Sequence, residues 1–171
     1  GAGYYEFYSR AMDAAGNYEA APALCDVALA YDPSPPSSSV GPTNPYWRNS
    51  SPVTVAASAS SSLSPVSSVE LWYRFSADNA TFGYWLLFGT DYVAPWSWSF
   101  DWPDGAGYYE FYSRATDAAG NYEDSPASAD ARNAYDPTLP SSSVTVSGPY
   151  WYGTSPKAID AIASDSLSGV S

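Results

Sequence analysis

Four side chains that carry oxygen atoms fall in segments typical of loops and could together bind calcium. They are Asp117, Asn121, Asp136 and Asp165. Ca²⁺ prefers carboxylate and carbonyl oxygens, and loops between tandem domains can supply several of them. Asp117 and Asn121 can instead cap a tight turn by accepting hydrogen bonds from main-chain amides. Structural capping is the favoured interpretation, calcium is the weaker alternative, and no other cofactor is expected.

Tryptophans form the second group of candidate binding residues. Segment 96–102 reads WSWSFDW, so its rings alternate with polar residues and are expected to face a core. Trp102, at the end of this segment, is expected to be its exposed member and could stack on a sugar ring. Trp47 and Trp151 each follow a Pro-Tyr pair. For these two, packing on a linker or a neighbouring domain is favoured over ligand binding.

Two Asn-x-Ser/Thr sequons, at Asn49 and Asn79, predict N-glycosylation. Such short motifs also arise by chance, so they carry weight only in a protein that is secreted. Both lie in segments expected at the surface, which is where a glycan can be accommodated.

The residue types that most enzymes use for catalysis are absent or isolated. There is no histidine, which removes the commonest general base and metal ligand. The lone cysteine, Cys25, is expected to be a buried inert thiol or to pair with a cysteine of a neighbouring domain. Glu6, Glu70 and Glu110 are expected on outer strand faces, where no cleft brings two carboxylates together. We therefore expect no enzymatic activity.

Charge excludes two classes of partner. The chain has 18 acidic and 6 basic side chains and a net charge of −12. Nucleic acids and anionic membranes attract clustered Lys and Arg, so neither is expected as a partner. No apolar run reaches the roughly 18 residues of a spanning helix, and membrane insertion of this segment is not expected. Abundant Tyr, Trp and Ser with a single lysine are typical of extracellular all-β proteins.

The sequence repeats itself with an offset of 104 residues. Residues 1–67 align without a gap on 105–171, and 43 of the 67 aligned residues are identical. The aligned segments 32–39 and 136–143 are rich in Pro and Ser. Because proline keeps such segments extended, they are expected to be stiff linkers. The predicted organisation is 1–32, the C-terminal part of one repeat; 33–36, a Pro-rich linker; 37–135, a complete repeat; 136–140, a linker; and 141–171, the N-terminal part of the next repeat.

Alternating hydrophobicity predicts short strands throughout a repeat. The strongest signal lies in 108–115, where four residues are expected to face a core: Tyr109, Phe111, Ser113 and Ala115. Further strands are expected over 69–75, 84–88, 96–102 and 122–132, and from Val53 onward. Turns are expected at 76–83 and 118–121, the second with Gly120 and Asn121 at positive φ. About seven short strands and no helical period predict an antiparallel β-sandwich.

Residues 107–123, GYYEFYSRATDAAGNYE, resemble the F–G hairpin of bacterial and archaeal immunoglobulin-like repeats, whose pattern runs G-x-Y-x-F-x-x-x-A-x-D-x-A-G-N. The segment 136–144 is similar to their D-x-T-x-P-x-x-x-V opening, and 69–75 and 164–170 are similar to their B–C region. The resemblance extends over essentially the whole chain, and the frequent use of Ser, Tyr and Trp is closer to archaeal than to bacterial members. It implies tandem immunoglobulin- or fibronectin-III-like sandwiches in a secreted surface protein.

Two functions are therefore expected as alternatives. The leading one is a structural segment of a long extracellular surface protein, such as a filament, sheath, stalk or adhesin shaft, which associates with identical chains or repeats. The alternative is a carbohydrate-binding module for surface glycans. We also expect the chain to be a window onto a longer polypeptide. The two partial repeats together lack the equivalents of 68–104, so those of neighbouring chains could not complete one sandwich between them. Residues 37–135 alone should instead close a seven-stranded sandwich.

Overall fold

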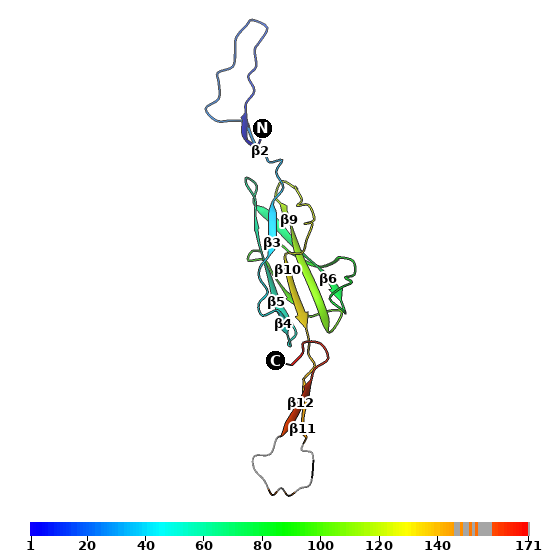
Figure 1. Ribbon diagram of the computed structural model, residues 1–171. Coiled ribbons are helices and arrows are strands. Elements are labelled where there is room, and N and C mark those ends of the chain that lie inside the picture. Colours follow the sequence, from blue (N-terminus) through cyan, green and yellow to red (C-terminus); the bar gives the residue numbers. More distant parts are fainter. Residues whose placement is uncertain (146–147, 149–150, 152, 154–158, 171) are drawn as a thin grey trace.

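The computed structural model describes residues 1–145, 148, 151, 153 and 159–170, and its regular elements are all β-strands. Figure 1 shows a long, narrow molecule with a hairpin at each end and a broader region between them. In chain order the strands are β1 (Gly3–Phe7), β2 (Val27–Tyr31), β3 (Ser37–Val40), β4 (Trp47–Arg48), β5 (Val53–Ser60), β6 (Val66–Ser76), β7 (Leu86–Asp91), β8 (Ser97–Phe100), β9 (Gly107–Asp117), β10 (Ala131–Tyr135), β11 (Ser141–Thr145) and β12 (Asp160–Ser164). The prediction of an all-β architecture is confirmed for the described residues.

The middle region holds two sheets built from residues 37–135. One has the strand order β3-β5-β8, and the other has the order β4-β10-β9-β6-β7. Neighbouring strands are antiparallel, except that β4 pairs with β10 in parallel through Trp47 and Ala134. Every residue of 37–135 is described, and this segment contains eight strands, one more than expected because of the two-residue β4.

The two sheets share one hydrophobic core. Phe100 on β8 lies with its ring centroid 4.9 Å from that of Phe111 on β9 and 5.3 Å from that of Tyr73 on β6. Since β8 belongs to one sheet and β6 and β9 to the other, these ring contacts join the two layers. This two-layered arrangement of antiparallel sheets fits a β-sandwich.

The predicted inward face of β9 is confirmed. Its four members are each at most 1% exposed: Tyr109, Phe111, Ser113 and Ala115. The outward face differs from the expectation, because Glu110 lies on it and is nevertheless only 1% exposed. The side chains of Arg74 and Arg132 cover this carboxylate from the two neighbouring strands.

Two predicted strand boundaries and one predicted backbone conformation are wrong. The return strand expected over 122–132 is limited to a bridge from Tyr122 to Thr116, and β10 begins only at Ala131. The main chain of Glu123 and Asp130 still donates to Ala115 and Phe111 of β9, whereas their side chains reach β3. The strand expected at 84–88 is shifted to Leu86–Asp91. In the turn at 118–121, Gly120 has a φ of 87°, but Asn121 does not adopt a positive φ.

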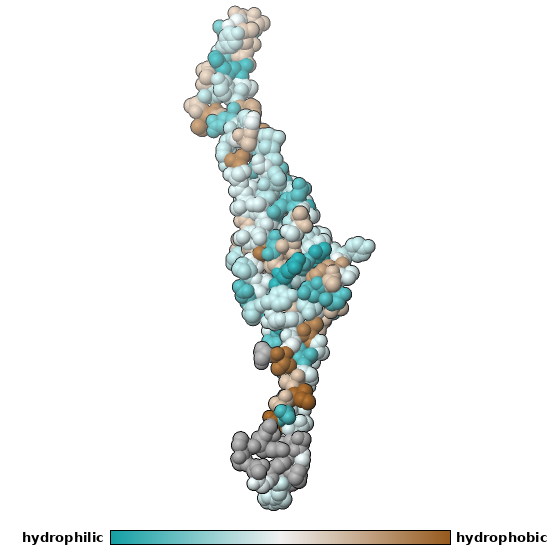
Figure 2. All heavy atoms as spheres, in the orientation of Figure 1, coloured by the Kyte–Doolittle hydropathy of each residue, from teal (hydrophilic) through white to brown (hydrophobic). Residues whose placement is uncertain are grey.

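The terminal hairpins reproduce the pairing of their counterparts in the middle region. Gly3 pairs with Tyr31 between β1 and β2, as Gly107 does with Tyr135 between β9 and β10. Likewise, β11 and β12 repeat the register of β3 and β5. Figure 2 shows strongly hydrophobic side chains on the terminal hairpins. Phe7, for example, is 52% exposed, whereas its counterpart Phe111 is fully buried.

Candidate functional site

The carboxylate of Asp32 joins the first linker to the middle region. Its Oδ1 accepts a hydrogen bond from the amide of Ser34 at 3.0 Å. Its Oδ2 accepts two from Ser64, through the amide at 2.7 Å and the hydroxyl at 2.8 Å. Asp32 is only 7% exposed. The hydrogen bonds from Ser64, and then that from Ser34, hold the pKa of Asp32 below its usual value, so the carboxylate is charged at neutral pH.

The turn after β9 reaches the same linker from the other side. Asn121 donates through Nδ2 to the main-chain oxygen of Asp32 at 2.8 Å and to Oδ2 of Asp117 at 2.9 Å. Oδ1 of Asp117 accepts from the amides of Ala119 and Asn121, as a turn cap does. Burial alone would raise the pKa of Asp117, but its hydrogen bonds outweigh burial and the pKa is lowered.

The second linker contains the same carboxylate arrangement 104 residues later. Oδ1 of Asp136 accepts from the amide of Thr138 at 2.9 Å, and Oδ2 accepts from the amide of Ser168 at 3.0 Å. These donors correspond to Ser34 and Ser64. We call the two arrangements the linker clamps: Asp32 with Ser34 and Ser64, and Asp136 with Thr138 and Ser168.

The four calcium candidates are divided between the two linker clamps. Asp117 and Asn121 lie at the first clamp, whereas Asp136 and Asp165 meet at Ser168, whose amide donates to both carboxylates. Asp165 also caps the amides of Leu167 and Gly169. In the described part of the chain, no group of three or more acidic, His or Cys residues is arranged to hold a metal ion. Calcium binding stays a prediction.

Two acidic side chains from the loop between β9 and β10 bind the edge strand β3. Glu123 accepts the amide of Ser38 at 2.8 Å and its hydroxyl at 2.6 Å. Asp130 accepts the amide of Val40 at 2.9 Å. Both carboxylates also accept main-chain amides of β9, from Ala115 and Ser113. We call Glu123 and Asp130 the edge clamp, because they occupy donors that an open sheet edge would offer to another chain.

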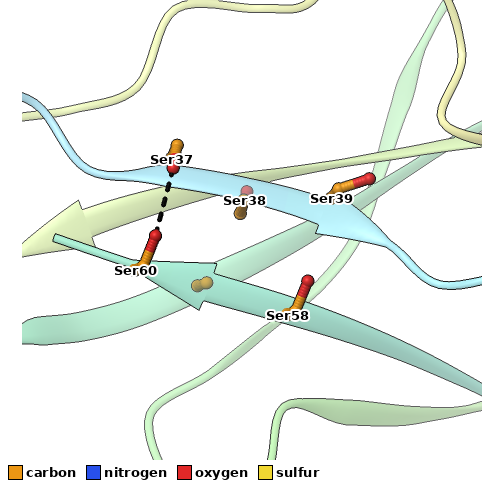
Figure 3. Close-up of a pocket in the computed structure, with 6 residues that line it drawn as sticks. Ser37, Ser38, Ser39, Ser58 and Ser60 are labelled. Carbon is orange, nitrogen blue, oxygen red and sulfur yellow. Dashed lines mark hydrogen bonds between the residues drawn. The ribbon is translucent and has the colours of Figure 1, made fainter.

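Serine hydroxyls line the outer side of the β3–β5 pair. Figure 3 shows Ser37 and Ser60 facing each other across the two strands, with their Oγ atoms 3.3 Å apart. The shallow groove around them has a volume of about 200 Å³ and is lined by Ser37, Ser38, Ser39, Ser58, Ala59 and Ser60. Its side chains carry no titratable group, so it offers hydrogen bonding but no general acid or base.

The expectation that Trp102 is exposed is wrong, since it is only 3% exposed. Its ring stacks on Tyr135 at 5.0 Å, and Nε1 donates to the main-chain oxygen of Ser50 at 3.0 Å. A positive φ of 56° turns its side chain back into the core. Trp47 is half-buried beside Tyr108. Trp151 is 83% exposed.

Both sequons lie at the surface. Asn49 follows β4, and Asn79 has a φ of 59° in a turn that Asp78 caps through the amides of Ala80 and Thr81. Cys25 is a free, half-buried thiol in the N-terminal hairpin. Glycosylation of the two asparagines and a partner for the cysteine stay predictions.

The glutamates of the five-stranded sheet are held by fixed partners. Glu110 forms ion pairs with Arg74 at 2.5 Å and Arg132 at 2.6 Å. Glu70 accepts hydrogen bonds from Trp72 and Tyr122. These contacts give both carboxylates a structural role on the sheet surface.

No family model and no curated protein matches the chain. Over the described residues, there is no helix with the length and apolar character needed to cross a bilayer. Sequence reasoning missed Asp32, Glu123 and Asp130, although the repetition of each of them 104 residues away was a usable signal.

Proposed function

We propose that this chain is a segment of a structural shaft made of tandem immunoglobulin-like units in an extracellular surface protein. The strand order of the two sheets supports an immunoglobulin-like connection, with β3, β5 and β8 facing a sheet centred on β9. A second support is Tyr109 near the start of β9, whose hydroxyl donates to the main-chain oxygen of Gly105 at 2.8 Å. Immunoglobulin domains have such a tyrosine corner at the same place.

The observation that carries the proposal is the recurrence of the linker clamp. Each clamp fixes an Asp-Pro linker to the unit that follows it, through the same donors 104 residues apart. Proline restricts the backbone of both linkers further. If every junction is held in the same way, each unit adds a constant length and rotation, which is the geometry of a shaft.

The surface chemistry agrees with this role. A net charge of −12 keeps a repetitive surface soluble through self-repulsion. The partners proposed are identical chains or repeats, in a filament, sheath, stalk or adhesin shaft. A carbohydrate-binding module is the second candidate, and one observation favours it: an open cleft beside Trp47, described in the next subsection.

Relaxation of ¹⁵N nuclei tests whether the linker is rigid. In the 171-residue chain, the amide of Ser34 should have an order parameter of about 0.85, as in the sheets. Electron microscopy of the full-length protein should show straight, unbranched fibres. An order parameter below about 0.6 at Ser34, or fibres that bend freely at every unit, would overturn the shaft.

A further inference from the structure

An open cleft lies where the middle region meets the turn that follows β12. Figure 1 shows β4 and the C-terminal end at this junction. The cleft has a volume of about 390 Å³, within the range of small-molecule sites. Its lining residues are Pro45, Trp47, Arg48, Asn49, Asp136 and Ser168.

We propose that this cleft binds one pyranose ring of a glycan. A pyranose has an apolar face and a rim of hydroxyl groups, each of which donates and accepts hydrogen bonds. Trp47 and Pro45 supply rings for the apolar face. Asp136 and Ser168 supply the acceptor lone pairs that remain beside their bonds to Thr138, Ser168 and Asp165. The side-chain amide of Asn49 supplies donors and an acceptor.

The lining fits other classes of ligand less well. Asp136 is the one carboxylate among the six lining residues, too few for a calcium ion, which takes six to eight oxygen ligands. A phosphate would lie beside the same carboxylate, which offsets the charge of Arg48. An apolar ligand would cover the side-chain amide of Asn49 and leave it without a partner. A neutral sugar with several hydroxyl groups avoids each of these unfavourable interactions.

Arg48 adds a donor to the wall of the cleft. Its Nη2 donates to the main-chain oxygen of Asn44 at 2.7 Å, which fixes the guanidinium. Its Nε is buried and has no hydrogen-bond partner among the described residues. A ligand oxygen at the wall can satisfy it after a small side-chain movement.

The position of Asn49 allows two sources for the same sugar chemistry. Asn49 lines the cleft and is the acceptor of a sequon. A glycan attached there would be held beside Trp47 at a high effective concentration. Alternatively, the ring belongs to a glycan on another molecule. The recognition by Trp47, Asp136 and Ser168 is common to both cases.

Nuclear magnetic resonance of the unglycosylated 171-residue chain tests the proposal. Glucose, galactose, mannose and N-acetylglucosamine are titrated separately while the indole N–H signal of Trp47 is followed. At least one sugar should give a saturable shift at millimolar concentration. Trp47→Ala, followed through the backbone amide signals of Arg48 and Asn49, should weaken that binding by about tenfold or more, because it removes the stacking ring. Trp151→Ala, at the equivalent position of the repeat and outside the cleft, should bind as the unchanged chain does.

A second variant guards against loss of the fold. Asn49 is exposed, so Asn49→Ala should leave the dispersion of the spectrum unchanged and weaken sugar binding by several-fold. If none of the four sugars shifts Trp47, or if Trp47→Ala and Asn49→Ala bind as tightly as the unchanged chain, the proposal is wrong.

The same chain made in a glycosylating host distinguishes the two sources. A glycan mass at Asn49, together with a Trp47 signal that no longer responds to added sugar, identifies the attached glycan as the occupant. A Trp47 signal that still responds identifies a free glycan. Both outcomes support the site. Neither depends on linker rigidity, so failure of the shaft proposal would be seen separately in the relaxation of Ser34.

Discussion

The side-chain amide of Asn121 donates a hydrogen bond to the main-chain oxygen of Asp32 at 2.8 Å, across 89 positions of sequence. This bond ties the turn after β9 to the linker that precedes β3. The same amide also donates to Asp117, which fixes its orientation. Asn17 makes the equivalent bond to Asp13 in the N-terminal hairpin, which provides a matched control.

Asn121→Ala should loosen the first linker. It removes the bonds to Asp32 and Asp117, so we expect the order parameter of the Ser34 amide to fall and the middle region to lose about 1–2 kcal/mol of stability. Relaxation of ¹⁵N and urea unfolding measure the two effects. Asn17→Ala should change neither. An equal effect of the two substitutions would show that turn capping, rather than the linker contact, is responsible.

Removing one carboxylate of the edge clamp should destabilise the middle region. Asp130→Ala leaves the buried amides of Val40 and Ser113 without their charged acceptor. The expected loss is roughly 1.5–3 kcal/mol in urea unfolding followed by tryptophan fluorescence. Asp26→Ala removes the corresponding carboxylate of the N-terminal hairpin and should leave the urea unfolding transition of the middle region unchanged. A loss below about 0.5 kcal/mol for Asp130→Ala would contradict the clamp.

Glu110→Gln should cost about 2 kcal/mol. It leaves two arginines without their buried counter-charge, but both reach water, which reduces the penalty below that of a fully buried pair. Because Glu110 itself is buried, the loss should persist in 0.5 M salt, well above the ionic strength at which exposed pairs are screened. Glu6→Gln, at the equivalent exposed position, should have no effect. If 0.5 M salt abolished the difference in stability between Glu110→Gln and the unchanged chain, Glu110 would instead form an ordinary surface ion pair.

Acid should loosen the turn that Asp78 caps. Hydrogen bonds from the amides of Thr81 and Ala80, and then from Ser76, lower the pKa of Asp78 to about 2. Because the pKa is lower in the folded chain than the ordinary aspartate value of 3.8, this contribution is present above pH 4 and is lost as the pH falls toward 2. The melting temperature of the unchanged chain should therefore drop more steeply between pH 4 and 2 than that of Asp78→Ala. Parallel curves would show that the cap adds no pH dependence.

Removal of divalent ions provides a test of the calcium alternative. The carboxylates of Asp117 and Asp136 are already occupied by amide donors, so we expect a chelator to leave the melting temperature unchanged. A rise of several degrees on adding Ca²⁺ would mean that these carboxylates bind the ion in solution.

The periodic parts of the fold could be predicted from the sequence, and the parts fixed by single side chains could not. Alternation along β8 and β9 placed Phe100 and Phe111 in the core, because burial of one face is a local pattern. Trp102 continues the alternation of 96–102 but lies beyond the end of β8, and its own positive φ of 56° sets the direction of its ring. No periodicity encodes such a turn.

The acidic residues were the weakest part of the sequence interpretation. Glu110 occupies an outward position but is buried by two arginines from neighbouring strands, a tertiary relationship that spacing does not reveal. Asp32 and Asp130 act on main-chain amides 32 and 90 residues away. Their partners are backbone groups, which every residue has, so the repetition of these acids marks the acids themselves but does not identify their partners.

The edge clamp has a consequence for synthesis of the chain. Glu19 and Asp26 are identical to Glu123 and Asp130, and the strand 141–144 is identical to 37–40, so affinity alone does not distinguish a repeat's own opening strand from its neighbour's. During translation, each opening strand is synthesised before its own clamp, and the opening strand of the next repeat is synthesised after that clamp. The order of synthesis therefore pairs each clamp with the opening strand of its own repeat. Refolding from denaturant removes this order, and strand-exchanged neighbours are its expected by-product.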